Sequence, residues 1–417
     1  MKSLLPSPAV AIVGRHNSGK TTLMVALIEE LCARGLDVGS IKHHSHASFD
    51  IDIPGKDSFR HRAAGASETI IASPDQMAQI TTLEHELECA DLVAKMPGHD
   101  IVLVEGYRKS GLPTIEVMRS GNTADEAVAS AFLEAAKSGE PLSSDFVQRA
   151  RWAAAYDPSS DQVAKMPHAA TVAVVSDIAS ACEAASIYGV PVFSLDAISE
   201  LCDFLQERFT RQRVTVAIQA GGESRRMGRS KATVPFAGRP LIMRMVERVA
   251  PAADEILITT NEPDNLAFLH DEYPGLRIRL QRDVLDERGA LPGFLTAFES
   301  ATTPYIAMIA CDMVFASANL IAAECLELSY TQADCVVPVN KHGFEPFHAV
   351  YNRESCLPAI RSCVKAGDKR AQAFLSMIEV CEFPQSRVLE AEPAGGCFIN
   401  VNTPEELASI EQQFLAS

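Results

Sequence analysis

A glycine-rich octapeptide near the start of the chain has the residue types needed to hold a phosphate chain. Residues 14–21 read Gly-Arg-His-Asn-Ser-Gly-Lys-Thr and lie between an apolar run and a segment with helical periodicity. Glycines let successive backbone N–H groups curl around a phosphate at a helix N-terminus, while Lys20 supplies a mobile positive charge and the Thr21 hydroxyl can ligate Mg²⁺. The motif predicts a binding site for a nucleoside triphosphate rather than an incidental glycine-rich turn.

The second half of the chain carries a different glycine-rich loop. Residues 219–231, Gln-Ala-Gly-Gly-Glu-Ser-Arg-Arg-Met-Gly-Arg-Ser-Lys, directly follow an apolar strand pattern. Small residues allow close packing against a nucleotide, and Arg226 and Lys231 can neutralise a triphosphate and a departing pyrophosphate. Asp312 follows another apolar run, where a carboxylate can bind a Mg²⁺ ion that bridges triphosphate oxygens. The alternative, that Asp312 caps a helix near Ser317, places the cap several residues too early.

Histidines and aspartates also gather between residues 43 and 62, where four histidines and three aspartates occur. Their spacing fits no standard zinc pattern, and a polar loop that faces anionic groups is an equally good interpretation, so both stay open. Further along, the apolar run 101–104 ends in Glu105. This acid is well placed to hold Mg²⁺, or its water shell, for the first site.

Charge and composition exclude several classes of protein. Lys and Arg number 37 against 54 Asp and Glu, a net charge of −17, which disfavours nonspecific attraction to nucleic acid or to an anionic membrane. The apolar runs are too short to cross a bilayer. The eleven cysteines include no Cys-x-x-Cys pair, which argues against a disulfide framework or a zinc ribbon. We expect a cytoplasmic protein without nucleic-acid or membrane partners.

Alternating strand and helix patterns predict two α/β domains in the 417 residues. In the first, strand patterns at 9–13, 38–42, 69–72, 101–104 and 171–175 indicate a parallel sheet, and residues 120–168 read as an insertion or lid with one helix at 125–138. The second contains strands at 214–218, 255–260, 277–281, 305–310 and 334–339, helices at 240–249, 317–329, 354–366 and 369–377, and a terminal helix from 404. We expect a P-loop NTPase-like α/β domain over 1–211 and a Rossmann-like α/β domain over 212–417.

The first half resembles the molybdopterin-guanine dinucleotide biosynthesis adaptor family, protein B (MobB). The resemblance rests on the loop 14–21, on I-K-H-x-x-H-x-x-F-D-I-D-x-P-G-K-D-S-F-R-H-R-A-A-G-A from Ile41, and on V-E-G-Y-R at 104–108. It covers about 9–118 and 171–209, and the 120–168 segment departs from it. It implies GTP binding with weak hydrolysis in support of a partner enzyme. The GTP site would comprise Gly14, Asn17, Ser18, Gly19, Lys20, Thr21 and Thr22, with Mg²⁺ at Thr21 and Glu105.

The second half looks like the molybdenum cofactor guanylyltransferases (MobA) over about 214–415. The motifs are A-G-G-x-x-x-R-M-G from Ala220 and F-I-N-V-N-T-P-E-E-L from Phe398. The resemblance implies transfer of GMP from GTP to the terminal phosphate of molybdopterin or Mo-molybdopterin, with loss of pyrophosphate. Lys231, Asp312 and Arg226 would be catalytic, and Asn400 and Asn402 would lie toward molybdopterin. GTP contacts are implied for Gln219, Ala220, Gly221, Gly222, Lys231, Asn261, Asp283 and Asp312, and Mg²⁺ binding for Asp312.

Three departures from the family pattern bear on the choice of base. The run Arg226–Lys231 is one residue shorter than the family's R-M-G-G-x-D-K, Gly-Ala-Leu-Pro-Gly at 289–293 replaces Gly-Pro-Leu-Ala-Gly, and Val314 replaces a common proline. The loops 220–231 and 289–293 are where the base would be read, so a molybdopterin cytidylyltransferase stays an alternative. That class typically shows A-A-G and R-F-G, so A-G-G and R-M-G favour guanine.

Two further alternatives come from other classes. A noncatalytic GTP-dependent adaptor for molybdoenzyme maturation would require Lys231 and Asp312 to be dispensable. A sugar-phosphate nucleotidylyltransferase would be expected to carry G-x-G-x-R in the loop. For the MobB and MobA interpretation, the expected partners are GTP and molybdopterin, together with molybdopterin-loading enzymes and apo-molybdoenzymes.

Overall fold

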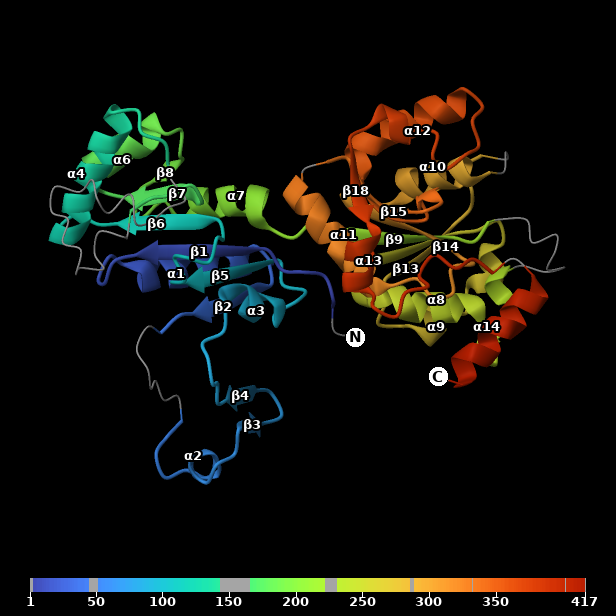
Figure 1. Ribbon diagram of the computed structural model, residues 1–417, viewed down its shortest axis with the longest axis horizontal. Coiled ribbons are helices and arrows are strands. Elements are labelled where there is room, and N and C mark those ends of the chain that lie inside the picture. Colours follow the sequence, from blue (N-terminus) through green and yellow to red (C-terminus); the bar gives the residue numbers. More distant parts are fainter. Residues whose placement is uncertain are drawn as a thin grey trace. The chain divides into compact units, whose positions relative to one another are not determined.

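The computed structural model describes residues 3–44, 52–142, 166–221, 231–285, 289–331, 333–401 and 403–416. The chain divides into two compact units, Ser7–Thr210 and Arg211–Ser417, and the residues Met1–Pro6 group with the second (Figure 1). The backbone N–H of Leu4 donates to the Pro251 carbonyl at 2.7 Å. The start of the chain therefore packs with the second unit, whereas the expected first domain included it.

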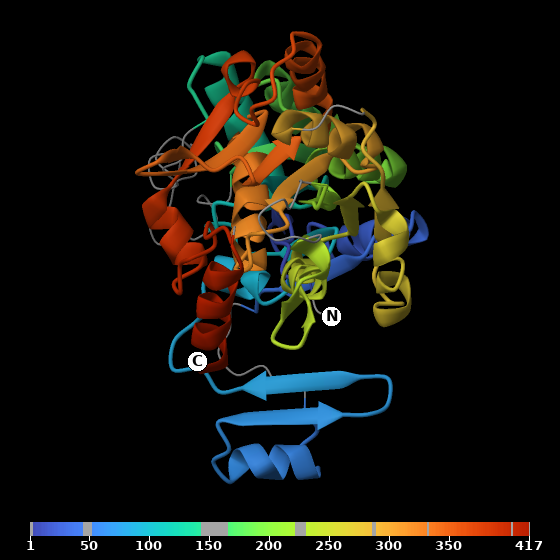
Figure 2. The same cartoon turned by 90° about the vertical axis from the view of Figure 1, so that its right-hand side faces the viewer.

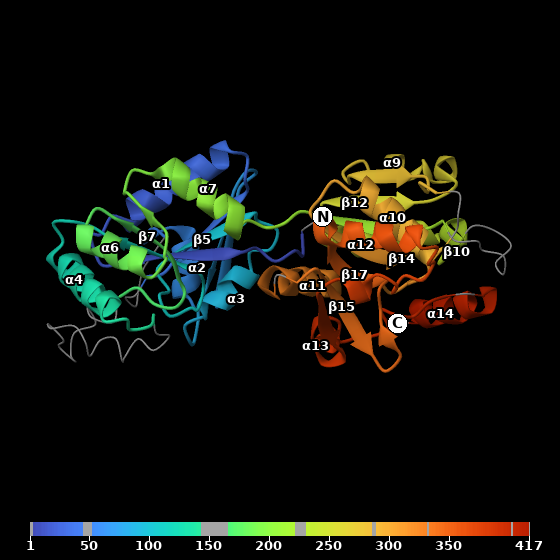
Figure 3. The same ribbon diagram turned by 90° about the horizontal axis from the view of Figure 1, so that it is seen from above.

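The first unit is built on a parallel sheet with the strand order β2-β5-β1-β6-β7-β8. Its strands are β1 (Ala9–Gly14), β2 (Val38–Lys42), β5 (Ile101–Glu105), β6 (Thr114–Met118), β7 (Thr171–Ser176) and β8 (Val192–Phe193). The helices are α1 (Lys20–Ala33), α3 (Cys89–Ala94), α4 (Thr123–Lys137), α6 (Ala179–Ile187) and α7 (Ile198–Phe209). Successive side chains of a strand point to opposite faces. Accordingly, α1 and α7 pack on one face and α3, α4 and α6 on the other (Figure 3).

Two expectations for this unit are corrected. The strand predicted at 69–72 does not join the parallel sheet: β3 (Glu68–Ala72) pairs antiparallel with β4 (Met77–Thr81), beside α2 (Asp57–Ala63) (Figure 2). Most of β3 is exposed, whereas strands of a parallel sheet are covered on both faces. The predicted insertion at 120–168 begins with α4, whose Val128, Ala129 and Phe132 are buried in the core. Residues 143–165 lie outside the described residues.

The second unit has a mixed sheet with the order β13-β12-β9-β14-β17-β15-β16, and β18 pairs with β15. Strands β9 (Val214–Gln219), β12 (Glu255–Thr259), β13 (Ile278–Gln281) and β14 (Tyr305–Ala310) are parallel, and β17 (His348–Asn352) is antiparallel to β14. The others are β15 (Cys335–Asn340), β16 (Gly343–Phe344), β18 (Val380–Pro384) and a hairpin of β10 (Pro235–Phe236) and β11 (Arg239–Pro240).

Helices cover both faces of this sheet. They are α8 (Leu241–Val249), α9 (Leu269–Glu272), α10 (Ala290–Ser300), α11 (Ala318–Thr331), α12 (Arg353–Lys365), α13 (Gln385–Ala391) and α14 (Pro404–Ala416). Buried side chains of α10 and α12 form one core and those of α8 and α11 another, on the opposite side of the sheet (Figure 1). No helix in the described ranges is both long and apolar enough to cross a membrane.

Two local expectations for the second unit are wrong. Residues 290–293, predicted as part of a loop, form the first turn of α10, because Leu291 and Phe294 are fully buried in the core. The helix predicted at 369–377 is reduced to a single 3₁₀ turn, Leu375–Met377. The other predicted strands and helices of this unit agree with the structure to within one or two residues at each end.

Candidate functional site

The phosphate-loop motif has the expected strand-loop-helix geometry. β1 ends at Gly14 and α1 begins at Lys20, after Gly19 with a φ of 91°. A Cβ on Gly14 would lie 2.5 Å from the Val117 carbonyl oxygen, so this position accepts only glycine without a backbone shift. The Ser18 hydroxyl donates to the Arg15 carbonyl at 2.8 Å, and Lys20 Nζ donates to the same oxygen. The loop thus closes on itself with the lysine ammonium inside it.

Thr21 and Glu105, predicted to share a Mg²⁺ site, meet in the structure. Thr21 Oγ1 donates to Glu105 Oε1 at 3.0 Å, and Lys42 Nζ donates to the same atom at 3.0 Å. The contact arises because β1 and β5 are neighbouring parallel strands, so the start of α1 and the end of β5 lie at the same edge of the sheet. A hydroxyl and a carboxylate are suitable Mg²⁺ ligands. Thr22 is exposed in the first turn of α1.

Helix α4 is joined to the phosphate loop by two polar contacts, of which the one between Arg15 and Asp125 is buried. Arg15 is 5% exposed and lies 3.4 Å from the fully buried Asp125. Burial lowers the pKa of the Arg15 guanidinium, and the charge of Asp125 acts in the opposite direction. Asn122 caps α4 with its side-chain oxygen and donates from Nδ2 to the His16 carbonyl at 3.1 Å. The loop and the start of α4 therefore hold one another in place.

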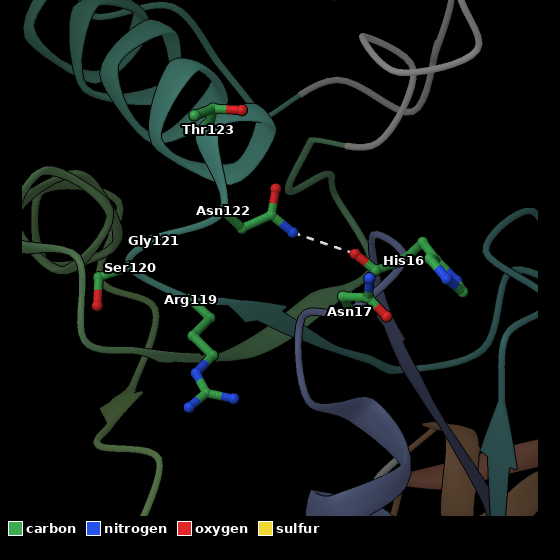
Figure 4. A pocket seen from close by; sticks show the side chains of 7 residues that line it. All are labelled: His16, Asn17, Arg119, Ser120, Gly121, Asn122 and Thr123. Atoms are coloured by element: carbon green, nitrogen blue, oxygen red, sulfur yellow. Dashed lines mark hydrogen bonds between the residues drawn. The ribbon is translucent and has the colours of Figure 1, made fainter.

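A cleft of about 450 Å³ opens beside the phosphate loop (Figure 4). It lies at the carboxyl ends of β1 and β6, and the helices that follow these neighbouring strands, α1 and α4, cover opposite faces of the sheet. Ligands of open α/β sheets bind at such a switch point. The sequence interpretation included Asn17 but missed residues 119–123, although the Asn122 cap ahead of the helix was a usable signal. The lining residues are His16, Asn17, Arg119, Ser120, Gly121, Asn122 and Thr123.

In the second unit, the predicted Lys231 and Asp312 form an ion pair. Lys231 Nζ lies 2.8 Å from Asp312 Oδ2, and the two side chains are 22% and 20% exposed. Asp312 follows β14, whose last residue pairs with Gln219 at the end of β9. Both charged groups are therefore accessible at the carboxyl edge of the sheet, next to the loop that starts at Gln219.

Three other predicted GTP contacts lie together at the same edge. Asn261 Nδ2 donates to Asp283 Oδ2 at 3.0 Å and to the Gly221 carbonyl at 3.3 Å. A Cβ on Gly221 would lie 2.9 Å from Asp283 Oδ2, so the loop requires a small residue there. The neighbouring Ala220 is held by its backbone N–H, which donates to the Thr259 carbonyl at 2.8 Å.

Among the predicted GTP contacts at this edge, two have a buried acceptor atom without a hydrogen-bond partner among the described residues. These atoms are Asp283 Oδ1 and Gln219 Oε1. The amide nitrogen of Gln219 is used, because Nε2 donates to the carbonyls of Gly289 and Ala290 at 3.3 and 3.4 Å. Buried polar atoms are normally paired, so these two acceptors point to a ligand that offers donors.

The segment near residue 400 reaches Asp312. Val401 N donates to the Asp312 carbonyl at 3.0 Å, and Asn400 beside it is exposed. The cap interpretation of Asp312 is wrong, because Ser317 Oγ accepts from Leu320 N at 3.2 Å and so caps α11. Gly222, Arg226 and Asn402 lie outside the described residues.

Asp312 is the carboxylate that the second site offers to a metal ion beside Lys231. Among the described residues no group of three or more His, Cys, Asp or Glu side chains could hold a metal. In the segment 43–62, His43 pairs with Glu86 at 2.7 Å, and Ser45–Ile51 lie outside the described residues. Mg²⁺ commonly binds through one or two carboxylates together with substrate phosphates and water. The Asp312 arrangement fits that mode of binding.

Comparison with known proteins finds a matching family model and relatives for each unit. A family model described as molybdopterin guanine dinucleotide synthesis protein B matches residues 9–135, and the MobA-like NTP transferase domain matches 216–383. The molybdopterin-guanine dinucleotide biosynthesis adapter protein of Escherichia coli is 39% identical over 144 residues, 33% of this chain and 82% of the relative. The molybdenum cofactor guanylyltransferase of Desulfosudis oleivorans is 34% identical over 199 residues, which are 48% of this chain and 94% of the relative.

Solved structures of a MobA protein and of a MobB protein are also similar to this chain. The molybdopterin-guanine dinucleotide biosynthesis protein A of Archaeoglobus fulgidus has a TM-score of 0.43 and 21% identity, covering 49% of this chain and all of that one. The MobB of Bacillus subtilis has a TM-score of 0.33 and 22% identity, covering 48% of this chain and 98% of that one.

Proposed function

The chain belongs to the MobB family in its first unit and to the MobA-like molybdenum cofactor guanylyltransferases in its second, and from this membership we propose how its residues perform the transfer. It is a nucleotidyltransferase of molybdenum cofactor biosynthesis joined to an adapter domain. GTP and molybdopterin are the substrates, and GMP passes to the terminal phosphate of molybdopterin. The observation that carries the proposal is the accessible Lys231–Asp312 pair beside the loop Gln219–Gly221.

Catalysis in this proposal depends on position and charge. Lys231 Nζ moves from Asp312 to a phosphate oxygen of GTP and stabilises the charge that develops as pyrophosphate leaves. Asp312 would hold a Mg²⁺ ion, which would supply positive charge to the triphosphate, and Arg226 adds a further positive charge. The loop Gln219–Gly221 and Asn261 orient the nucleotide, and Asn400 faces molybdopterin, a role that the family resemblance also implies for Asn402. Phosphoryl-type transfer requires little more of a protein than such positioning.

The proposal is tested by pyrophosphate release from the full chain with Mg²⁺ and molybdopterin, comparing GTP with CTP, ATP and UTP. GTP-selective release supports the guanylyltransferase, whereas a preference for CTP would place the chain in the cytidylyltransferase class. Release of orthophosphate alone would report hydrolysis at the first unit and count against transfer.

Selectivity for guanine is expected to depend on Asp283. Guanine presents the N1–H and 2-amino donors on one edge, which match the unpaired acceptors Asp283 Oδ1 and Gln219 Oε1, whereas cytosine presents one amino donor. Asp283→Asn replaces an acceptor by a donor and should lower the ratio of kcat/KM for GTP over CTP about tenfold or more, since one good base contact contributes roughly 1–3 kcal/mol of discrimination. Asp264→Asn, at a highly exposed side chain, is the matched control. Equal losses with GTP and CTP would show that Asp283 contacts ribose or phosphate instead.

The first unit, in our proposal, binds a second GTP with its phosphates on residues 14–21 and its guanosine in the adjoining cleft, and supports transfer by engaging cofactor or a recipient enzyme. Fusion raises the local concentration of the two sites.

Thr123→Trp should fill the cleft and weaken binding of GTP, but not of inorganic triphosphate, because only GTP has a nucleoside. Calorimetry in a Lys231→Ala background measures both, with Ser130→Trp on the same helix as the control. Equal weakening of both ligands would contradict the assignment of the cleft.

A further inference from the structure

A histidine and a glutamate are buried behind the Asp312 loop, and the proposed transfer uses neither. His348 begins β17 and Glu324 lies on α11, and both are fully buried. His348 Nδ1 lies 3.5 Å from Glu324 Oε1. Removing such groups from water is costly, and an apolar pair of similar volume is often as stable or more stable. Stability alone therefore does not explain this pair.

The histidine is connected to the loop that carries Asp312. β17 runs antiparallel to β14, and His348 pairs with Ile309 near the end of that strand. His348 Nε2 accepts a hydrogen bond from the backbone N–H of Ser317 at 3.0 Å. Ser317 closes the loop that starts after Ala310, and Cys311 N at the other end donates to the Gln219 carbonyl at 3.1 Å. Both ends of the Asp312 loop are therefore fixed to the sheet.

The hydrogen bond from Ser317 determines where the imidazole proton is. Because Nε2 accepts from an amide, the proton of a neutral ring must be on Nδ1, which faces Glu324. Burial lowers the pKa of His348 to about 3, so the ring is neutral near pH 7. The Phe398 ring packs edge-on against the imidazole at 5.7 Å and restricts its rotation. His348 Nδ1 and both carboxyl oxygens of Glu324 have no hydrogen-bond partner among the described residues, so the 3.5 Å approach of Nδ1 to Oε1 is a polar contact longer than an ordinary hydrogen bond, and Oε1 is the acceptor that the Nδ1 proton faces.

We propose that His348 and Glu324 are positioning residues for Asp312. Glu324 orients the imidazole, the imidazole holds the Ser317 N–H, and that contact fixes the loop from which the Asp312 carboxylate reaches GTP and its metal ion. The inference rests on the proposed function only in giving Asp312 that role. Partners that orient a metal ligand from behind typically change metal affinity or activity by about 10–100-fold when they are lost.

The histidine is tested with two substitutions of different chemistry. His348→Leu removes the acceptor and leaves the Ser317 N–H unpaired, whereas His348→Gln can place an amide oxygen near the position of Nε2. The first should weaken Mn²⁺ binding in the presence of GTP, followed by the electron paramagnetic resonance signal of free Mn²⁺, about tenfold or more, and lower kcat in parallel. His348→Gln should keep an Mn²⁺ affinity and a kcat close to those of the unaltered protein.

Substitutions of Glu324 distinguish a positioning role of the pair from a purely structural one. Glu324→Met removes the carboxyl group that Nδ1–H faces, which is also a buried acid, so it should leave the Tm unchanged or higher while weakening Mn²⁺ binding. Glu324→Gln keeps an acceptor and should retain both. Glu324→Met carries the test if His348→Leu does not fold.

Two results would count against different claims. An active unaltered protein whose kcat and Mn²⁺ binding are unaffected by His348→Leu and Glu324→Met would overturn the positioning role, even if Tm changed. An unaltered protein that releases no pyrophosphate from GTP would instead overturn the proposed function.

Discussion

Asp312→Ala is expected to abolish guanylyl transfer, with kcat falling by about a thousandfold or more. The substitution removes the protein carboxylate proposed to hold Mg²⁺ and leaves Lys231 without the partner that lies 2.8 Å from its ammonium group. Losing one preorganised electrostatic contact to a transition state typically costs about 10²–10³ in rate, and here two groups are affected. Pyrophosphate release with GTP and molybdopterin measures the effect.

Two controls make this result specific to the site. Asp264→Ala removes an acid of the same unit whose side chain is 95% exposed, and it should leave turnover unchanged. Tm should also change little in Asp312→Ala, because the carboxylate is partly exposed and surface pairs contribute about 0–1 kcal/mol. Retained turnover with a normal Mg²⁺ dependence would refute the catalytic assignment and favour the noncatalytic adaptor.

Lys20→Ala should remove GTP binding from the first unit and leave the transfer reaction in place. Lys20 Nζ lies inside the phosphate loop, where a triphosphate would replace the Arg15 carbonyl as its partner. A hydrogen bond to a charged group contributes about 1.5–3 kcal/mol, so GTP affinity at this unit should fall at least about tenfold. The readouts are GTP-dependent orthophosphate release for the first unit and pyrophosphate release for the second.

The comparison for Lys20 is Lys137→Ala, an exposed lysine of α4 paired with Glu183, which should change neither product. Loss of pyrophosphate release together with orthophosphate release in Lys20→Ala would mean that the two sites are energetically coupled. That result would contradict separable functions, while leaving the assignment of each site intact.

The candidate sites could be predicted from sequence where the chemistry is local. A glycine-rich loop such as 14–21 would bind a phosphate through consecutive backbone groups, so its spacing alone predicts a phosphate site, and the strand and helix around it follow from periodicity. The same holds for Gln219–Gly221 after β9 and for Asp312 after β14. In parallel strands the carboxyl ends meet at one edge, so the approach of Thr21 to Glu105 follows from the topology.

Prediction was wrong where burial overrides local pattern. The sequence of Gly289–Gly293 predicts a loop because it contains glycine and proline. In the structure Leu291 and Phe294 are buried in the core, and residues from Ala290 onward belong to α10. The strand pattern at 69–72 was correct for a strand but did not show its partner, β4. Propensity describes a residue and its neighbours in sequence, whereas sheet membership depends on distant strands.

The sequence by itself determined the two α/β units, the phosphate loop and the residue types for nucleotidyl transfer, because these depend on short-range spacing and on chemistry carried within a motif. Only the tertiary structure decided which residues complete the sites. The cleft at Arg119–Thr123 exists because α1 and α4 cover opposite faces of one sheet. Glu324, His348 and Ser317 come together because α11 packs across β17, and no spacing along the chain encodes that contact.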